Sequence, residues 1–364
     1  MTIANNLKKC KIFFTGGGTG GSVAPLLAIY EELKNDVSFE FSWVGTKDGI
    51  ENEMLKNKNI KYLAIYAGKF RRYWSWQNCL DLFYIKIGFW QSLFLLIREK
   101  PNIIISAGSF VGVPLIWAGW LLRVPILIHQ QDAQPGLANK IIALMATKIT
   151  VALEKSLKDY GRKAVWVGNP IRSELIEIKI NKQEALQKLG LAKDQPVVLV
   201  LGGGTGALAI NELVKNNLAE LTKFCQIVHI TGKGKNSVTA ENKNYCSFEF
   251  LDTFGLIKVF TTADIVVSRC GMSVLTELSY LGKPAILIPL PNSHQEANAV
   301  IFSEKKAAIV LQQNNLTNEN FVQTVRSILN NRGLQAELSR NIQTIIKRGA
   351  NQAIVKIIKD ISIC

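Results

Sequence analysis

KIFFTGGGTGGSVAP, residues 11–25, joins a strand-like apolar run to five glycines and then to a small-residue stretch that starts a helix. A glycine turn between a strand and a helix lets the backbone come close to a ligand and exposes amide N–H groups to an anion. The same pattern returns as VVLVLGGGTGALAIN at residues 197–211. A chain of 364 residues is longer than one core usually supports. The repeat therefore predicts an α/β protein with two Rossmann-like, doubly wound domains facing a central cleft.

Short β-branched runs between the two glycine turns and beyond them are typical of buried parallel strands. They lie at residues 39–44, 103–106, 126–129, 227–231, 265–268 and 285–289. The segment VWVGNPIRSEL, residues 165–175, interrupts this pattern with a glycine and a proline. We therefore expect a first domain over residues 1–169 and a second over residues 170–364, with the last helix as a candidate to pack back on the first.

The amino-acid composition indicates which kinds of molecule the protein could bind. The formal net charge is +15, and a basic surface attracts nucleic acid, anionic lipid or phosphorylated substrates. No RNA- or DNA-binding motif accompanies the charge, so we expect no nucleic-acid partner. Six cysteines without a Cys-x-x-Cys pair, together with only three histidines, argue against a metal site.

One apolar stretch raises the question of a membrane span. Residues 103–128 carry a single charge and are long enough to cross a bilayer. Glycines and prolines punctuate the stretch, so we expect a buried strand–helix–strand unit. At the basic N-terminus, the apolar segment is too short for a signal-peptide core, which favours a cytoplasmic location.

The glycine turns exclude two nucleotide-binding classes. Neither turn carries the lysine of a P-loop, which argues against nucleoside triphosphate hydrolysis. The second strand of each unit ends without the acid that binds the ribose of a dinucleotide, as VGT and ITG show. The Asp-x-Asp triplet of metal-dependent sugar transferases is absent as well. The remaining candidate ligand is the diphosphate of a sugar nucleotide, held by helix N-termini and basic side chains.

A second candidate phosphate site lies in the segment SRCGMSVLTELSYLGKPAILIPLPNSHQEANA, residues 268–299. A strand ends here at a glycine turn, and the helix that follows could bind phosphate with its first amides. Glu277, in the early turns of that helix, could accept hydrogen bonds from ribose hydroxyls, although an ordinary helix carboxylate is the alternative. Gln295 follows the next strand and is expected to reach the sugar.

Residues 68–100 alternate basic and aromatic side chains, a mixture suited to the interface of an anionic lipid surface. The candidate membrane residues are Trp74, Trp76, Phe89 and Trp90. The alternative is an ordinary core stripe made by Leu82, Ile85, Phe89, Leu93 and Leu96.

Seven motifs in the same order resemble one family over almost the whole chain. They are GGGTGGS, SAGSFVGVP (106–114), HQQDAQPGLANK (129–140), VGNPIR (167–172), GGGTGA (202–207), RCGMSVLTE and SHQEANA. The family is MurG, the UDP-N-acetylglucosamine–N-acetylmuramyl-(pentapeptide) pyrophosphoryl-undecaprenol N-acetylglucosaminyltransferases. Each motif alone is weak, and the ensemble is specific.

The resemblance implies an inverting, metal-independent glycosyltransferase of the GT-B fold, with no cofactor beyond the donor UDP-N-acetylglucosamine. It implies transfer of N-acetylglucosamine to the muramyl 4-hydroxyl of undecaprenyl-linked lipid I, which forms lipid II in peptidoglycan synthesis. Roles in cell-wall biogenesis, cell shape and cell division follow from that activity. The implied location is the cytoplasmic face of the cell membrane, as a peripheral protein on anionic inner-leaflet lipids. Cell-wall synthesis proteins are further candidate partners.

The resemblance also implies site residues. Thr19, Gly20 and Gly21 would lie near the diphosphate and the acceptor, and Ser22 ends the same loop. Arg172, Gly204 and Leu251 would line the donor cleft, with Gln295 near the sugar. The positions around the nucleotide would be Met272, Ser273, Val274, Leu275, Thr276 and Glu277.

This chain departs from the family pattern at its candidate base. Ser22 stands where the family usually has histidine, and serine is no general base at neutral pH unaided. The usual His-Glu-Gln-Asn is His-Gln-Gln-Asp here, so the carboxylate has moved to Asp132. Our hypothesis is that Asp132 accepts the proton or orients the acceptor. His129 is the competing candidate, with a plain structural role at a strand end as its alternative.

Two further departures concern the donor. Gly204 lacks the hydroxyl often present at its position, and Thr205 beside it is the candidate to replace that hydroxyl. Val274 stands where threonine is common, which removes one hydrogen bond to the diphosphate. Three alternatives therefore stay open: another GT-B glycolipid transferase, a UDP-N-acetylglucosamine 2-epimerase, and a non-catalytic nucleotide-sugar-binding subunit. An epimerase would have no use for the aromatic and basic surface.

Overall fold

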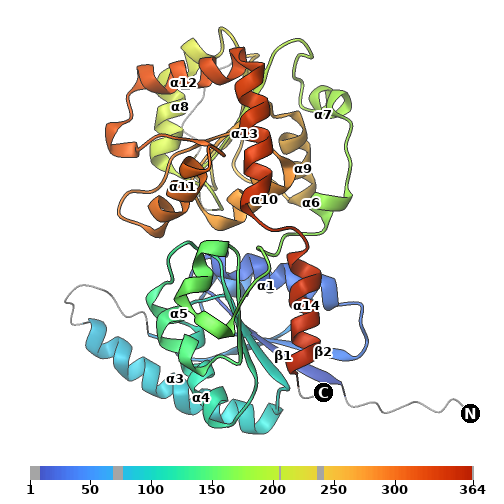
Figure 1. Cartoon of the computed structure of the whole chain (residues 1–364), viewed down its shortest axis with the longest axis vertical. Helices are drawn as coiled ribbons and strands as arrows, with labels where there is room; N and C mark the ends of the chain where they lie inside the picture. Colours follow the sequence, from blue (N-terminus) through green and yellow to red (C-terminus); the bar gives the residue numbers. More distant parts are fainter. Residues whose placement is uncertain (1–8, 69–76, 205, 236–241, 363–364) are drawn as a thin grey trace, which may run out of the picture. The chain divides into compact units, whose positions relative to one another are not determined.

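The computed structural model describes residues 9–68, 77–204, 206–235 and 242–362, with the side chains of 77–79 left out (Figure 1). The chain divides into two compact units. The first contains the chain up to Arg172 together with the segment from Lys347 onward, and the second contains Ser173–Ile346. The first unit is therefore built from both ends of the sequence.

The first unit is a parallel sheet of seven strands in the order β3-β2-β1-β4-β5-β6-β7. The strands are β1 (Cys10–Thr15), β2 (Phe39–Gly45), β3 (Lys61–Ala64), β4 (Ile103–Ser106), β5 (Ile126–Gln130), β6 (Lys148–Val151) and β7 (Ala164–Trp166). The helices are α1 (Gly20–Leu33), α2 (Ile50–Leu55), α3 (Gln77–Glu99), α4 (Gly112–Leu121), α5 (Leu137–Ile142) and α14 (Ala350–Ile361), with short 3₁₀ turns at Ala143–Met145, Glu154–Asp159 and Gly161–Lys163.

Helices cover both faces of this sheet, which is why its central strands are apolar throughout. On one face Ile12 and Phe14 of β1 pack with α1 and α14. On the other face Phe13 packs with α3 and α4. The predicted strand–helix–strand unit over residues 103–128 is confirmed as β4, α4 and β5.

The last helix, α14, packs against α1 in the first unit (Figure 1). Ile354 and Ile358 are fully buried in the same cluster as the core of β1 and α1. Asn351 holds the start of the helix, because its Nδ2 donates to the carbonyl of Ile171 at 2.9 Å and its Oδ1 accepts from the amide of Ile171 at 3.1 Å.

The second unit is a parallel sheet of six strands in the order β10-β9-β8-β11-β12-β13. The strands are β8 (Val197–Leu201), β9 (Gln226–Ile230), β10 (Tyr245–Phe248), β11 (Ile265–Ser268), β12 (Ala285–Leu287) and β13 (Ile309–Val310). The helices are α6 (Glu174–Glu177), α7 (Lys182–Lys188), α8 (Leu208–Leu221), α9 (Thr253–Thr262), α10 (Met272–Leu281), α11 (His294–Glu304), α12 (Asn318–Asn330) and α13 (Arg332–Ile345), with a 3₁₀ turn at Gln313–Asn315.

Both sheets reverse their strand order at the same place. The reversal falls between β1 and β4 in the first unit and between β8 and β11 in the second. In open α/β sheets this point opens a crevice at the carboxyl ends of the strands, where ligands bind. Each glycine turn follows the first strand of its sheet and therefore lies at this point. The prediction of two doubly wound, Rossmann-like domains is confirmed.

Candidate functional site

The first glycine loop is held by side chains from three neighbouring segments. Trp43 of β2 donates from Nε1 to the carbonyl of Gly16 at 3.1 Å. Ser22 and Ser109 donate to the carbonyl of Gly17 at 3.0 and 2.8 Å. With these carbonyl oxygens tied down, the exposed tip of the loop runs from Gly18 to Gly21.

The tip leads directly into α1, whose first amides face no capping side chain in the part of the chain that the structure describes. Thr19 is the N-cap residue and makes no side-chain cap hydrogen bond. The first-turn N–H groups of a helix have no partner within it, and the helix dipole favours an anion there. The start of α1 could therefore bind an anion through the amides of Gly20 and Gly21, and their contact with a diphosphate stays a prediction.

Ser22 has a different role from its neighbours. It is buried, and its hydroxyl faces the carbonyls of Gly17 at 3.0 Å and Thr19 at 3.2 Å. A hydroxyl occupied by its own loop shapes that loop, which leaves the proton-accepting role to another residue.

The segment after β5 comes together with this loop. Gln131 donates from Nε2 to the carbonyl of Gly21 at 3.0 Å, which joins the start of α1 to the motif that contains Asp132. Gln130 shapes the turn from inside: its Nε2 donates to the carbonyl of Asp132 at 2.8 Å, and its Oε1 accepts from Asn139 at 2.5 Å. Asp132 is half-buried on this turn. The structure thus brings Thr19–Gly21 and Asp132 to one edge of one sheet.

His129 lies in the interior instead. It is fully buried, with Nδ1 3.0 Å from the hydroxyl of Thr150 and Nε2 2.8 Å from Oδ1 of Asn169. Burial lowers the pKa of His129 to about 4, against the opposing effect of the Asn169 hydrogen bond. A neutral ring with both nitrogens engaged has none left for a substrate hydroxyl. This geometry favours Asp132 over His129 as the base.

The second glycine loop forms a tight turn after β8. Gly203 and Gly206 have positive φ angles of 84° and 72°, and the amide of Gly206 donates to the carbonyl of Gly203 at 3.0 Å. A Cβ at Gly206 would lie 2.1 Å from the carbonyl oxygen of Thr231, so no other residue fits there. Gly204 is exposed at the tip, and Thr205 lies outside the described residues.

The start of α10 is the second candidate phosphate site. Its N-cap, Gly271, makes no side-chain cap hydrogen bond, and a Cβ built there would meet nothing within 4 Å. The N-terminus of α10 therefore has no side-chain cap, and the space beside Gly271 is open. Of the predicted nucleotide positions, Met272, Val274 and Leu275 are buried apolar side chains, and Thr276 spends its hydroxyl on the carbonyl of Met272 at 2.6 Å. Ser273 is half-buried and Glu277 is buried.

Gln295 joins the two loops that follow β11 and β12. Its Oε1 accepts from the amides of Cys270 at 3.2 Å and Leu290 at 3.1 Å. The oxygen is thus engaged twice, and a contact of Nε2 with the sugar stays a prediction. Beside it, Arg269 is buried and donates to the carbonyls of Ile288 and Pro289, each at 3.1 Å. Sequence reasoning did not identify Arg269 as a residue that holds the loop after β12. A charged residue at the end of an apolar strand could have indicated such a role.

The remaining predicted donor residues fall in different parts of the chain. Leu251 is half-buried just before α9, where the N-cap Asp252 accepts from the amide of Gly255 at 2.7 Å. Arg172 is half-buried at the end of the first unit's N-terminal segment. Across the described residues, no three His, Cys, Asp or Glu side chains gather as metal ligands.

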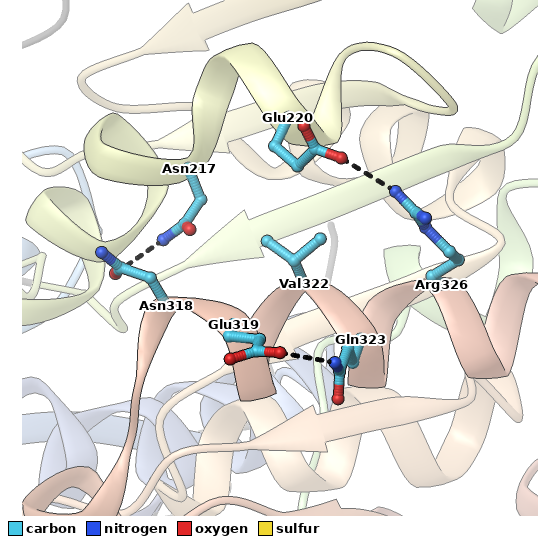
Figure 2. Close-up of a pocket in the computed structure, with 7 residues that line it drawn as sticks. All are labelled: Asn217, Glu220, Asn318, Glu319, Val322, Gln323 and Arg326. Carbon is cyan, nitrogen blue, oxygen red and sulfur yellow. Dashed lines mark hydrogen bonds and ion pairs between the residues drawn. The ribbon is translucent and has the colours of Figure 1, made fainter.

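A groove of about 280 Å³ lies between α8 and α12 in the second unit, and Figure 2 shows the residues that line it. Its polar groups satisfy one another: Asn217 donates to Asn318 at 2.9 Å, and Arg326 pairs with Glu220 at 3.0 Å. These residues of α8 lie in its C-terminal half, away from the glycine loop that precedes it. The groove is therefore separate from the candidate site.

An apolar surface covers the outer side of α3 in the first unit. Residues Leu80–Glu99 form the one helix, within the described ranges, that is long and apolar enough to cross a membrane, and only 22% of its most apolar window is buried. We call the α3 surface the exposed side chains Leu80, Phe83, Trp90, Phe94 and Ile97 of this helix, with Trp120 and Leu121 at the end of α4, which packs against it.

The structure gives the exposure of the residues that the sequence offered as membrane contacts or as core, and their contact with lipid stays a prediction. Trp90 is 67% exposed, whereas Phe89 is half-buried. The core-stripe alternative holds for Leu96, which is buried, and is wrong for Leu82, which is 51% exposed. Trp74 and Trp76 lie outside the described residues. Exposed basic side chains border the surface at Lys86, Arg98 and Arg123.

Comparisons with known proteins agree over nearly the whole chain. Residues 12–151 match the glycosyltransferase family 28 N-terminal domain, and residues 197–354 match the glycosyltransferase family 28 C-terminal domain. The chain is 38% identical over 313 residues to the UDP-N-acetylglucosamine–N-acetylmuramyl-(pentapeptide) pyrophosphoryl-undecaprenol N-acetylglucosamine transferase of Clostridium kluyveri, covering 84% of this chain and 88% of that one. It is 36% identical over 359 residues to transferase 2 of the same name from Bacillus cereus, covering 97% and 99%.

Two solved structures are similar to the chain over nearly its whole length. The crystal structure of MurG from Acinetobacter baumannii has a TM-score of 0.76 and 25% identity, covering 96% of this chain and 99% of that one. A UDP-GlcNAc 2-epimerase from Neisseria meningitidis, bound to UDP-GlcNAc, has a TM-score of 0.70 at 14% identity, covering 97% and 100%. The second likeness is one of fold alone.

Proposed function

Since the chain belongs to the MurG family of GT-B glycosyltransferases, we propose that it transfers N-acetylglucosamine from UDP-N-acetylglucosamine to the muramyl 4-hydroxyl of lipid I, forming lipid II. The family predicted from the motifs is confirmed, and the epimerase and the non-catalytic subunit are not favoured. The observation that carries the proposed mechanism is the contact between Gln131 and Gly21, which brings a carboxylate beside a diphosphate-binding loop.

The acceptor half of the reaction belongs to the first unit. The amides of Gly20 and Gly21 at the start of α1 bind the acceptor diphosphate, and Asp132 takes the proton of the muramyl 4-hydroxyl. The oxygen attacks the anomeric carbon, the new O–C bond forms as the bond to UDP breaks, and the configuration inverts. Holding the two reactants in line accounts for much of the acceleration.

The donor half belongs to the second unit. The first amides of α10 and the glycine loop after β8 stabilise the diphosphate as it leaves with the bonding electron pair. Glu277 binds the ribose hydroxyls, and the Nε2 amide of Gln295 binds the sugar. Val274 offers no hydroxyl at its position, so backbone amides take a larger share of the diphosphate contacts here.

The location that we propose is the cytoplasmic face of the cell membrane. The α3 surface joins exposed aromatic side chains to Lys86, Arg98 and Arg123, the combination that binds anionic lipid without spanning it. A lipid-linked acceptor requires such an approach. Anionic inner-leaflet lipids and lipid I are thus the proposed partners, and cell-wall synthesis proteins remain further candidates.

Release of UDP from UDP-N-acetylglucosamine, measured with and without a lipid I analogue, tests the activity. We expect release that depends on the analogue and is accompanied by a disaccharide-lipid product. Release without the analogue, or epimerised UDP-sugar with no release, would contradict the proposal.

The variant Asp132→Asn tests the base. Because general base catalysis contributes about 10²–10⁴-fold, kcat should fall by about that factor while the KM for UDP-N-acetylglucosamine stays within about twofold. Asp159→Asn is the matched control, since Asp159 is an exposed carboxylate of the same unit. Full turnover by Asp132→Asn would remove this residue from the mechanism.

A further inference from the structure

Glu51 is a carboxylate in an unusual position. It lies in the first turn of α2, and none of its surface is exposed. No lysine, arginine or histidine among the described residues forms an ion pair with it. A buried charge without a counter-charge is costly unless hydrogen bonds hold it. The question is what this carboxylate does for the protein.

Its two oxygens join two loops at the carboxyl edge of the first sheet. Oε2 accepts from the amide of Gly18 at 3.1 Å, in the loop after β1. Oε1 accepts from the amide of Thr46 at 2.9 Å and from its hydroxyl at 2.8 Å, in the loop after β2. Each of these partners is a donor, which suits an ionised carboxylate, an acceptor only.

Three glycines make room for this carboxylate. A Cβ at Gly17 would lie 2.3 Å from the carboxyl carbon of Glu51, and one at Gly49 would lie 2.1 Å from Oε1. At Gly45 a Cβ would lie 2.3 Å from the hydroxyl of Tyr62 and 2.9 Å from Cγ of Glu51, so this glycine makes room for both side chains. Part of the glycine content that suggested a ligand is therefore explained by a side chain of the protein itself.

The bond to Gly18 completes the support of the first glycine loop. The loop carbonyls at Gly16 and Gly17 are held by Trp43, Ser22 and Ser109, as described above. Glu51 holds the amide of Gly18, so that this amide is not available to an anion. The acceptor diphosphate is then left to the amides that follow Thr19, at the start of α1.

We propose that Glu51 is a positioning residue for the acceptor site: its carboxylate occupies the amide of Gly18 and thereby sets the conformation in which the loop presents Gly20 and Gly21. This inference rests on the proposed function, because it names the acceptor as the ligand of that loop. Glu51 acts through the loop and does not touch the substrate.

The test compares Glu51→Gln with Glu53→Gln, which makes the same change on the exposed side of the same helix. Glutamine has one acceptor oxygen, so its NH₂ group must face one of the two donors. Losing a hydrogen bond to a charged group should raise the KM for a lipid I analogue about tenfold to a hundredfold. The KM for UDP-N-acetylglucosamine should stay within about twofold. Hydrogen–deuterium exchange of the loop peptide, residues 16–22, should become faster in Glu51→Gln alone.

A second, milder variant keeps the test valid if Glu51→Gln does not fold. Thr46→Val keeps the shape of the side chain and removes one of the three donors to Glu51, so it should raise the acceptor KM by a smaller factor. Unchanged loop exchange in a folded Glu51→Gln protein would overturn the proposal, as would equal increases in both KM values. If the wild-type protein transfers no sugar, the proposed function fails, and loop exchange alone still decides whether Glu51 sets the loop.

Discussion

His129 and Asp132 lie three residues apart in the chain, yet they have opposite surroundings. The sequence made both candidates for the base because each stands in the same motif. Only the structure shows that His129 is enclosed by Thr150 and Asn169, while Asp132 lies on the turn beside the first glycine loop. Residue type and spacing made both residues candidates, and burial distinguishes between the two neighbours.

The role of Glu51 could not be predicted from the sequence. The glycine loops, Asp132 and Gln295 were identified in the sequence because they belong to motifs that follow strands. Glu51 stands in TKDGIENEML, an unremarkable turn and short helix. Its role depends on the adjacency of β1 and β2 in the sheet, which brings Gly18 and Thr46 to one carboxylate. Gly18 and Glu51 are 33 residues apart in the chain, so no local sequence pattern indicates their hydrogen bond.

Buried histidines make stability depend on pH. Burial lowers the pKa of both His129 and His229 to about 4, whereas an unfolded chain has a histidine pKa of about 6.5. Between these values the unfolded chain binds protons that the folded protein does not, so the free energy of unfolding falls as pH falls from 6.5 toward 4. At pH 5 each histidine should cost about 2 kcal/mol relative to pH 7.5.

Urea unfolding of the wild type and of His129→Gln at pH 7.5 and pH 5 measures this. We expect the variant to be less stable at pH 7.5, because it loses two hydrogen bonds, and to lose about 2 kcal/mol less than the wild type on acidification. An identical pH dependence in the two proteins would show that His129 does not titrate on unfolding.

At the scale of elements, fully buried apolar strands were predictable and the half-buried edge strands were not. The predicted strands correspond to β2, β4, β5, β9, β11 and β12, which are buried on both faces or nearly so. The prediction missed β3, β6, β7, β10 and β13, which have two to four residues each. Apart from β6 these strands are mostly half-buried, so their residues form no continuous apolar run.

The α3 surface carries the prediction that belongs to this scale. Phe94 is 67% exposed on α3, and burying a phenylalanine in a lipid interface contributes about 1.5–3 kcal/mol. Phe94→Glu should therefore weaken co-sedimentation with vesicles that contain anionic lipid by about tenfold or more. Added salt should weaken the binding of the wild type, since the bordering basic residues act through screened charges.

Val37→Glu is the control for that experiment, because it places the same charge at an exposed apolar position of the same unit, on the turn between α1 and β2. Val37→Glu should bind as the wild type does. If the wild type fails to bind anionic vesicles, or if the two variants bind alike, the α3 surface is not the membrane-binding site.

At the scale of the whole molecule, the glycine repeat predicted the two doubly wound units, and the last helix was a candidate to pack back on the first of them. The segment from Lys347 onward belongs to the first unit, so the second unit is an insertion within the first in sequence terms. An amphipathic helix near the end of a chain indicates that it packs somewhere. It packs on the first sheet because Ile12, Phe14 and neighbouring apolar side chains form an apolar face there, which Ile354 and Ile358 cover.

Ile354→Ala tests the contribution of α14. Ile354 is fully buried in the first unit's core, so this truncation should lower the free energy of unfolding by about 2–5 kcal/mol. Lys356→Ala changes an exposed residue of the same helix and should lie within about 0.5 kcal/mol of the wild type. Equal stability of the two variants would show that the first unit does not depend on α14. Limited proteolysis should locate the loss in the first unit.

The placement of α14 has a consequence for how the protein is made. A ribosome emits the N-terminal strands first, but the helix that seals one face of their sheet emerges only after the whole second unit. During synthesis the inserted unit can finish folding while Ile12, Phe14 and Leu26 still lack their final cover. A nascent chain therefore carries an unsealed apolar face until residues 350–361 have emerged. A chain that stopped before Ala350 would leave that face open permanently.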